Sequence, residues 1–210
     1  MRVTQAERAR TRQALIRAGL GLFAAQGFAA TTVDQVAAAA GVAKGTLYNY
    51  FPSKEDVALA GLVAALEDVR ADLGCIIALP AFAERLQAVF ERLGQASGGN
   101  RELIWLWTVE NLRRGRSEAA SARLGDILGH LCADAQARGE LRADRPAAAM
   151  ALDFLGLVLA HIGRWYHAGE AAGLDDELRQ AFAAYLDGAR RGVAGGASAP
   201  PAPEQSSARP

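Results

Sequence analysis

The sequence has few of the residues that build metal sites. It holds only two cysteines, Cys75 and Cys132, and three histidines among 210 residues. The two cysteines lie far apart with no metal-ligand spacing around them, so we expect neither a metal site nor a cofactor. We interpret both cysteines as small buried hydrophobic residues of a protein in a reducing compartment.

Long hydrophobic runs are also absent. A run such as residues 154–160 is far too short to cross a bilayer. The N-terminus is rich in arginine but has neither the apolar segment nor the cleavage site of a signal peptide. These absences predict a soluble cytoplasmic protein with no membrane partner.

Residues that favour strands are sparse as well. No stretch of the chain alternates apolar and polar residues as a surface strand would. Alanine, leucine, arginine and glutamate dominate instead, and these residues favour helices. The 22 glycines suggest many helix ends. The composition therefore predicts an all-α fold, and the length allows one large domain or two smaller ones with a real core.

The charges are unevenly distributed along a chain that has no net charge. Neutrality alone disfavours a nucleic-acid partner, because phosphate binding normally needs a basic surface. Residues 1–54, however, contain seven basic and two acidic residues, a net charge of +5, and the remainder carries −5. Such asymmetry indicates a segment that contacts nucleic acid or a membrane surface.

Local signals predict four helices before residue 74. The first spans about residues 4–26. Thr32 begins the second, because its hydroxyl and the side chain of Gln35 can form a capping box. The third stops before Pro52, since a proline disfavours helical geometry in the preceding residue. The fourth, capped by Ser53, continues to about residue 73.

Five further helices follow a predicted break at residues 74–80. We expect them at about residues 81–96, 101–114, 117–138, 145–168 and 175–192. The chain would then contain about nine helices. Residues 194–210 offer no apolar anchor that could offset the cost of ordering them, so we expect a disordered tail.

The second and third helices have the layout of a helix-turn-helix unit. The second carries an apolar stripe that can pack on the first helix: Val33, Val36, Ala37 and Ala40. A turn of suitable length, Gly41 and Val42, follows it. In such units the third helix lies in the major groove of DNA and its N-terminal residues meet base edges.

Three residues at the start of the third helix are candidates for reading bases. Lys44 can donate to guanine O6 and N7, and Thr46 can hydrogen-bond to a base or contact a thymine methyl group. Gly45 costs about 1 kcal/mol relative to alanine inside a helix. We interpret this glycine as a point of close approach to DNA.

Four other residues are candidates for phosphate contact. Thr32 lies at a helix N-terminus, where free N-H groups favour an anion. Tyr48 and Tyr50 carry hydroxyl groups suited to phosphate oxygens. Lys54 lies in the first turn of the fourth helix, where a cation opposes the helix dipole and a nearby phosphate would reverse that effect. Without DNA, Lys54 would be a solvated surface lysine.

Residues 41–55, Gly-Val-Ala-Lys-Gly-Thr-Leu-Tyr-Asn-Tyr-Phe-Pro-Ser-Lys-Glu, closely resemble the signature of the TetR (tetracycline-repressor-like) family of bacterial transcriptional regulators. Residues 22–28 and 31–33 also resemble that family. The resemblance covers about the first 60 residues, and beyond them only the pattern of helices is similar.

The resemblance implies roles for individual residues. It implies base or groove contact from Lys44, Gly45 and Thr46, phosphate contact from Thr32, Tyr48, Tyr50 and Lys54, and a core that includes Phe23, Val36, Leu47 and Phe51. One position departs from the family, because Asp34 stands where some members carry a base-reading arginine. A carboxylate there repels phosphate, although it can accept a hydrogen bond from a cytosine amino group.

The resemblance also implies a two-part chain. Residues 1–52 would be a three-helix DNA-binding domain, and residues 53–193 a helical domain that binds a small molecule and dimerises. The helix at 145–168 is apolar around so much of its circumference that it must be covered on more than one side. We therefore expect a four-helix interface between two copies, as a palindromic operator would require.

Candidate residues for dimerisation lie on the apolar faces of the last two helices: Leu155, Leu159, Ile162, Tyr166, Leu178, Phe182, Tyr185 and Leu186. Candidates for an effector pocket are chosen because ligand sites are mostly apolar with few polar groups: Phe90, Trp105, Trp107, Glu110, His130, His161 and Trp165. Each of these aromatic residues could equally be ordinary core. The histidines lack metal-ligand spacing and are expected to be hydrogen-bonded structural residues.

The sequence favours a homodimeric repressor that a small lipophilic or aromatic effector releases from a palindromic double-stranded DNA operator. Two other classes of function stay open: a helical enzyme or ligand carrier on the same scaffold, and a helical dimer that acts through protein partners. Nothing in the sequence supports catalysis, since it shows no Ser-His-Asp order, no paired carboxylates and no Gly-rich phosphate loop.

Overall fold

The computed structural model describes residues 4–114, 119–168 and 173–194. These residues form ten helices and no strand, which confirms the all-α prediction. The count exceeds the predicted nine by one short helix, α5 (Leu73–Ile77), within the stretch expected to interrupt the helices. Apart from Ala194, the predicted tail lies outside the described residues.

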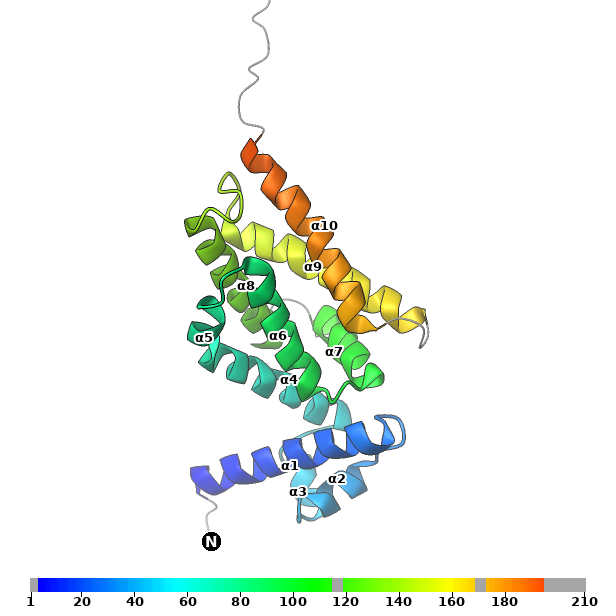
Figure 1. Ribbon diagram of the computed structural model, residues 1–210. Helices are drawn as coiled ribbons and strands as arrows, with labels where there is room; N and C mark the ends of the chain where they lie inside the picture. Colours follow the sequence, from blue (N-terminus) through cyan, green and yellow to red (C-terminus); the bar gives the residue numbers. More distant parts are fainter. Residues whose placement is uncertain (1–3, 115–118, 169–172, 195–210) are drawn as a thin grey trace, which may run out of the picture.

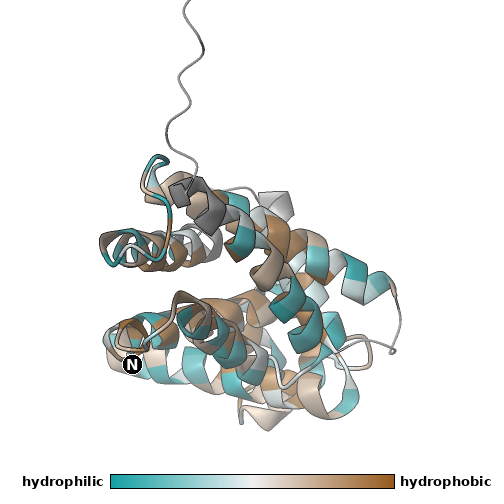
Figure 2. Ribbon diagram, turned by 45° about the horizontal axis from the view of Figure 1, so that its top comes forward, coloured by the Kyte–Doolittle hydropathy of each residue, from teal (hydrophilic) through white to brown (hydrophobic). Residues whose placement is uncertain are grey.

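The other nine helices begin and end close to the expected residues. They are α1 (Gln5–Gln26), α2 (Val33–Ala39), α3 (Lys44–Tyr48), α4 (Lys54–Ala71), α6 (Phe82–Ala96), α7 (Arg101–Arg114), α8 (Ala119–Ala137), α9 (Ala147–His167) and α10 (Leu174–Ala194). Figure 1 shows α1, α2 and α3 together at one end of the molecule, with α4 leading from them into a bundle of the remaining helices. Each of these helices carries both hydrophobic and hydrophilic residues (Figure 2), as expected for a helix that packs on one face and meets water on the other.

The three N-terminal helices share a core that the sequence predicts. Phe23, Val36, Leu47 and Phe51 are each at most 3% exposed. The predicted capping box of α2 is confirmed, because Thr32 Oγ1 accepts a hydrogen bond from the Gln35 backbone N-H and Gln35 Oε1 accepts one from the Thr32 backbone N-H. Local signals are therefore enough to place α2 against α1.

Helices α1 and α4 cross at two glycines. A Cβ atom on Gly19 would lie 2.6 Å from Val57 Cγ1, and one on Gly61 would lie 2.7 Å from Leu20 Cδ2. Real Cβ atoms do not approach neighbours so closely, so these positions need glycine for the helices to touch. The first three helices are thus packed directly on the first helix of the bundle.

Lys54 joins the start of α4 to the connection between α1 and α2. Its ammonium group donates hydrogen bonds to the backbone carbonyl oxygens of Phe28 at 2.8 Å, Thr31 at 3.0 Å and Ala29 at 3.3 Å. The same nitrogen lies 4.5 Å from the centroid of the Phe28 ring, a cation–π distance. The protein itself therefore stabilises a cation here, so Lys54 is not the solvated surface lysine expected in the absence of DNA.

Helix α7 holds the same region from another side. The Asn100 side-chain amide donates to the carbonyl oxygen of Phe23 at 2.7 Å, and Glu102 Oε2 accepts from the backbone N-H of Ala29 at 3.2 Å. We use the term junction for the α1–α2 connection, residues 27–32, together with the side chains of Lys54, Asn100 and Glu102. Both α4 and α7 thus fix the end of α1 from which the α2–α3 unit continues.

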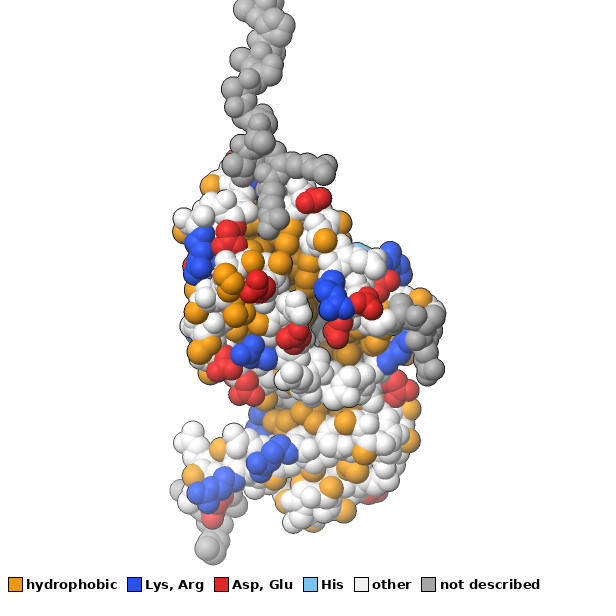
Figure 3. Space-filling view, in the orientation of Figure 1, with side chains coloured by type: hydrophobic (Ala, Val, Ile, Leu, Met, Phe, Trp, Pro, Cys, Tyr) orange, Lys and Arg blue, Asp and Glu red, His pale blue; other side chains and the backbone are white. Residues whose placement is uncertain are grey.

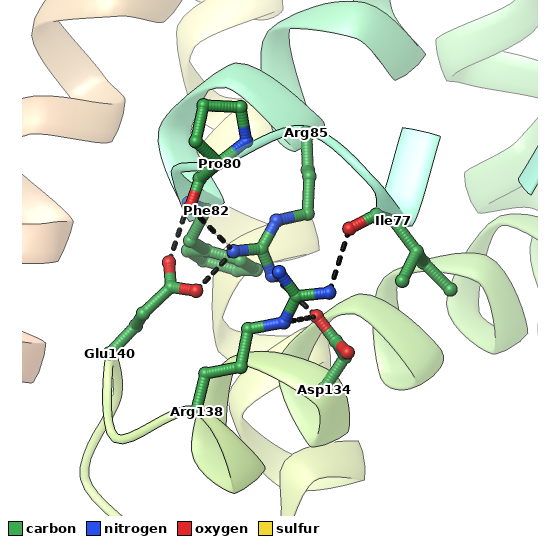
Figure 4. A network of polar contacts seen from close by, with 7 residues as sticks. All are labelled: Ile77, Pro80, Phe82, Arg85, Asp134, Arg138 and Glu140. Carbon is green, nitrogen blue, oxygen red and sulfur yellow. Dashed lines mark hydrogen bonds and ion pairs between the residues drawn. The ribbon is translucent and has the colours of Figure 1, made fainter. Parts of the chain in front are cut away.

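A buried arginine closes the opposite end of the bundle (Figure 4). Arg85 of α6 is fully buried and pairs with Asp134 of α8 at 2.6 Å and with Glu140. Glu140 also accepts a hydrogen bond from the Phe82 backbone N-H at 2.7 Å, which caps the N-terminus of α6. Arg138 completes the network by pairing with Asp134 at 2.9 Å. A buried charge needs such partners, so this network fixes α6 against α8.

The two cysteines differ from each other. Cys132 is buried and free, and burial raises the pKa of its thiol to about 11. Cys75 is free but exposed on α5, so the expectation that both are buried is wrong for this residue. The short helix α5 was not predicted, and its outer face carries the thiol.

Helix α9 is the most apolar of the long helices that the structure describes. It is long and apolar enough to cross a membrane by those two measures alone. The central helix of a soluble bundle meets the same criteria, and α9 packs against α7, α8 and α10.

Replacing Lys54 with methionine tests whether the lysine stabilises the folded protein. Methionine keeps much of the apolar stem but removes the donors to three carbonyl groups, so we expect the free energy of unfolding to fall by about 1–3 kcal/mol. Urea denaturation followed by circular dichroism measures the change in the absence of DNA. The control is Lys44→Met, at an exposed ion pair, which we expect to leave stability unchanged. Equal effects of the two substitutions would contradict a structural role for Lys54.

Candidate nucleic-acid interface and bundle cavity

The turn between α2 and α3 has the geometry that a helix-turn-helix unit needs. Gly41 has φ of 71°, in the left-handed region that favours glycine, and the Val42 backbone N-H donates to the carbonyl oxygen of Ala37. Helix α3 then begins after Ala43, whose side chain offers no cap. The free N-terminal N-H groups of α3 lie beside the side chains predicted to read bases.

Those side chains are accessible. Lys44 and Gly45 are exposed and Thr46 is partly exposed. Tyr48 is 48% exposed, one of two large hydrophobic residues exposed to that degree within the described parts of the chain. A Cβ atom on Gly45 would meet nothing within 4 Å, so nothing in the described protein requires glycine there.

The candidate phosphate contacts lie in different settings. Thr32 is exposed at the N-terminus of α2, where its hydroxyl belongs to the capping box. Tyr50 is half-buried and packs against the core. Lys54 is engaged by the carbonyl groups of the junction. Of the four, Tyr48 and Thr32 are the most accessible, and phosphate contact stays a prediction for all of them.

Lys44 forms an ion pair with Asp34 that sequence reasoning missed. Its ammonium nitrogen lies 2.9 Å from Asp34 Oδ1 and 3.0 Å from Oδ2, joining the first turn of α3 to the first turn of α2. Both side chains are more than half exposed, at 54% and 62%. The hydrogen bond with Asp34 and its charge raise the pKa of Lys44. Ten residues separate the two in sequence, so helix periodicity gave no signal for the pair.

Basic side chains gather along α1. Arg8, Arg10, Arg12 and Arg17 are exposed, and Figure 3 shows lysine and arginine side chains spread over this end of the molecule. The Arg12 guanidinium lies 5.2 Å from the centroid of the Phe51 ring, next to the end of α3. Together with Lys44, five of the seven basic residues of this segment are therefore exposed.

The larger domain contains a cavity between α4, α6, α7, α9 and α10. We call it the bundle cavity; it has a volume of about 100 Å³ and is open to solvent on one side. Its walls are mostly aliphatic and include Leu62, Leu155, Val158, Leu159 and Ile162. Polar side chains are few among its lining residues and include Thr108 and Asp175. Figure 3 shows a hollow in this face bordered by charged side chains.

Two of the predicted pocket residues line the bundle cavity. Phe90 and Trp107 form part of its wall, and the Trp107 indole N-H donates to the carbonyl oxygen of Ala58 on α4 at 2.8 Å. Trp165 lines an adjoining recess that shares Ile104 and Asp175 with the cavity. The side chain of Glu110 lies outside the described residues.

Three other pocket candidates do not line the bundle cavity, and effector contact stays a prediction for each of them. Trp105 stacks on Tyr166, with ring centroids 4.6 Å apart, and closes the contact between α7 and α9. His130 is exposed and bonded through Nδ1 to the Asp126 carbonyl oxygen. His161 lies 3.1 Å from Glu177 of α10. Trp105 and His161 thus contact neighbouring helices, whereas His130 is bonded within α8.

The predicted dimer residues also make contacts within one protomer, and their place at an interface between protomers stays a prediction. Four line the cavity: Leu155, Leu159, Ile162 and Leu178. The others pack between helices: Tyr166, Phe182, Tyr185 and Leu186. Periodicity identified the apolar faces of α9 and α10 but could not tell a face covered by the same chain from one covered by a partner.

A different face of α9 is left uncovered in the protomer. Leu152 is 44% exposed, and the neighbouring positions on that face, Ala148, Gly156 and Ala160, are exposed too. Spacing of four residues places them along one side of the helix. Sequence reasoning overlooked this face because its residues are small.

Comparison with known proteins agrees with this architecture. Residues 15–60 match the family model described as bacterial regulatory proteins, tetR family. The HTH-type transcriptional regulator TcmR of Streptomyces glaucescens is 45% identical over 80 residues, 38% of this chain and 34% of TcmR. The chain thus matches only about a third of that relative's length.

Two similarities extend over most of the chain. The HTH-type transcriptional repressor BepR of Brucella suis is 28% identical over 186 residues, which cover 80% of this chain and 86% of BepR. The crystal structure of Thermus thermophilus FadR, a TetR family transcriptional repressor in complex with lauroyl-CoA, superimposes with a TM-score of 0.63 and 28% identity. That match covers 92% of this chain and all of the FadR chain.

These matches agree with the exposed start of α3, the buried core of α1–α3 and the helical bundle behind them. Residues 15–60 carry the DNA-binding signature of the TetR family, and most of the chain is similar to transcriptional regulators of that family.

Proposed function

We propose that this regulator is a homodimeric repressor that leaves a palindromic DNA operator when a small lipophilic or aromatic effector enters the bundle cavity. The observation that carries the proposal is the exposed N-terminal end of α3, where Lys44, Gly45 and Thr46 stand free of the core. The proposed divisions are a DNA-binding domain over residues 1–52 and an effector and dimer domain over 53–193. The protein acts in the cytoplasm without a cofactor.

In the proposed complex α3 lies in the major groove. Lys44, Gly45 and Thr46 contact base edges, and Thr32, Tyr48 and Tyr50 contact the flanking phosphates. The arginines of α1 add a long-range attraction to DNA. Lys54 contributes chiefly by holding the junction, which sets the position of α2 and α3, and any phosphate contact from it is secondary.

The proposed dimer uses the uncovered face of α9 around Leu152. Small residues at Gly156 and Ala160 let a partner helix approach closely, and Leu152 supplies apolar area that water otherwise covers. A twofold interface pairs the same patch on both protomers, which places two α3 helices for two half-sites. A palindromic operator has this symmetry.

The proposed effector has an apolar body. The walls of the bundle cavity are aliphatic and aromatic, and few polar groups interrupt them. The similar FadR structure holds lauroyl-CoA, a molecule with a long alkyl chain, which supports an apolar guest in this type of bundle. Here the carboxylate of Asp175, one of the lining residues, disfavours an anionic group beside it.

Helix α7 connects the bundle cavity to the junction. Ile104, Trp107 and Thr108 line the cavity, and one turn earlier Asn100 and Glu102 hold the end of α1 and the connection after it. A guest that moves α7 therefore acts on the contacts that position α2 and α3. Effector binding then favours protomer arrangements in which the two α3 helices no longer match their half-sites.

Gly45→Ala tests the proposed DNA contact. The same substitution is expected to change stability and DNA affinity in opposite directions, so a loss of folding cannot be mistaken for a loss of binding. Alanine is the better helix former and has room in the protein, so the free energy of unfolding should rise by about 0.5–1 kcal/mol. We expect affinity for DNA to fall about tenfold or more, because the added methyl group separates α3 from the bases. Fluorescence anisotropy with labelled DNA from upstream of the regulator's own gene measures affinity, and urea denaturation measures stability.

Wild-type protein that bound no upstream fragment more tightly than random DNA would contradict the repressor function. It would favour one of the two other classes, an enzyme or carrier or a partner-binding dimer. A Gly45→Ala protein that bound the fragment as tightly as wild type would contradict close approach at that residue.

Leu159→Trp tests the cavity as the effector site. The larger side chain fills space beside Val158 and Ile162, so the operator should still bind while the effector concentration needed for release rises about tenfold or more. The measurement is release of labelled operator by lipophilic compounds that release the wild-type protein. Thermal unfolding confirms that the variant is folded, and unchanged release by the folded variant would place the effector elsewhere.

Leu152→Arg tests the proposed dimer face. A charged side chain at the centre of an apolar interface should convert the dimer to monomers and lower operator affinity. Analytical ultracentrifugation measures the mass, and Ala137→Arg, at an exposed position near the end of α8, is the control. A variant that remained dimeric would exclude this face as the interface.

A further inference from the structure

We propose that Asp34 and Lys44 act as a single unit that reads one G·C base pair in each half-site. Lys44 donates to guanine O6 and N7, and Asp34 accepts from the cytosine N4 amino group. This inference rests on the proposed function, because it requires α3 to lie in the major groove. It assigns a specificity role to Asp34, the one position where this chain departs from the residue types expected at the interface.

The geometry of the pair supports a shared role. Its two partners come from the first turns of α2 and α3, the two helices of the helix-turn-helix unit, and the Lys44 nitrogen lies 2.9 and 3.0 Å from the two Asp34 oxygens. Both side chains are more than half exposed, so their outer edges are open to a ligand. A carboxylate has about four acceptor sites and an ammonium group three donors, so each keeps unused capacity while the pair is intact.

The edge of a G·C pair complements such a unit. In the major groove guanine presents two neighbouring acceptors, N7 and O6, and cytosine presents a donor, N4, next to O6. Guanine O6 and cytosine N4 are hydrogen-bonded to each other, so they lie about 2.9 Å apart. A donor and an acceptor that the protein holds at a similar separation can therefore meet both groups side by side.

An A·T pair fits this unit less well. In an A·T pair the donor adenine N6 lies between two acceptors, adenine N7 and thymine O4. Lys44 therefore meets a single acceptor there, whereas a G·C pair offers it two adjacent acceptors. The thymine methyl group also lies next to O4. The order of acceptor, acceptor and donor therefore favours G·C.

The ion pair also removes the objection to a carboxylate near DNA. An isolated Asp34 would repel the phosphates, but the ammonium group of Lys44 neutralises it at hydrogen-bond distance. The pair further restricts the long lysine side chain before DNA arrives, which lowers the ordering cost of binding. Asp34 thus acts both as an acceptor for a base and as a positioning residue for Lys44.

Selection of binding sites from randomised DNA tests this inference. The variants are Asp34→Ala and Asp34→Asn, and the control is Glu55→Ala, which removes one negative charge from the neighbouring α4. Wild-type protein should enrich a site with one invariant G·C pair at matching positions of the two half-sites. Asp34→Ala should lose about tenfold or more of the discrimination at that position and keep the preferences elsewhere. Asp34→Asn retains a carbonyl acceptor and should keep part of the preference.

Direct affinity measurements separate readout from charge. Asp34→Ala should bind random DNA at least as tightly as wild type, because a negative charge has been removed, while its advantage for the selected site shrinks. The same preferences in wild type and Asp34→Ala, or an A·T pair at the affected position, would overturn the inference. If wild-type protein enriches no sequence at all, the proposed function fails, and that outcome is distinct from selection of a site that ignores Asp34.

Discussion

The rest of the structure depends on how the connection between α1 and α2 is held. Lys54 donates to the carbonyl groups of Phe28 and Thr31 from the start of α4. At the start of α7, Asn100 bonds to Phe23 in the last turn of α1 and Glu102 bonds to Ala29 in the connection. These contacts fix where α2 begins, and α2 carries α3 through a short turn. The position of the proposed DNA-reading residues is therefore set by side chains of the larger domain.

The same helices form walls of the bundle cavity, so the proposed effector site is linked to the proposed DNA-reading residues through α4 and α7. Helix α4 contributes Leu62 to the cavity and α7 contributes Trp107, whose indole joins the two helices. A molecule bound in the cavity displaces side chains of α4 and α7 that lie only a few helical turns from the junction. Hydrogen bonds to backbone carbonyls suit this purpose, because they are lost over small displacements.

The DNA-binding end could be predicted from the sequence because its signals are local. The Thr32 capping box, the position of Pro52 and the spacing of buried residues such as Leu47 each act within one or two helical turns. The role of Lys54 could not be predicted, since its partners lie more than 20 residues away in sequence. For the predicted pocket and dimer residues the sequence signal is incomplete for a related reason. Periodicity shows that a face such as that of Leu155 is apolar, but tertiary packing decides what covers it.

Hydroxyl-radical footprinting of the operator tests the central claim most directly, because it reports where on the duplex the protein sits. Two identical α3 helices in successive major grooves predict two protected regions, related by twofold symmetry and one helical turn apart, about 34–36 Å. Both regions should disappear together when effector is added. A single protected region, or protection that extends without symmetry along the DNA, would contradict the account.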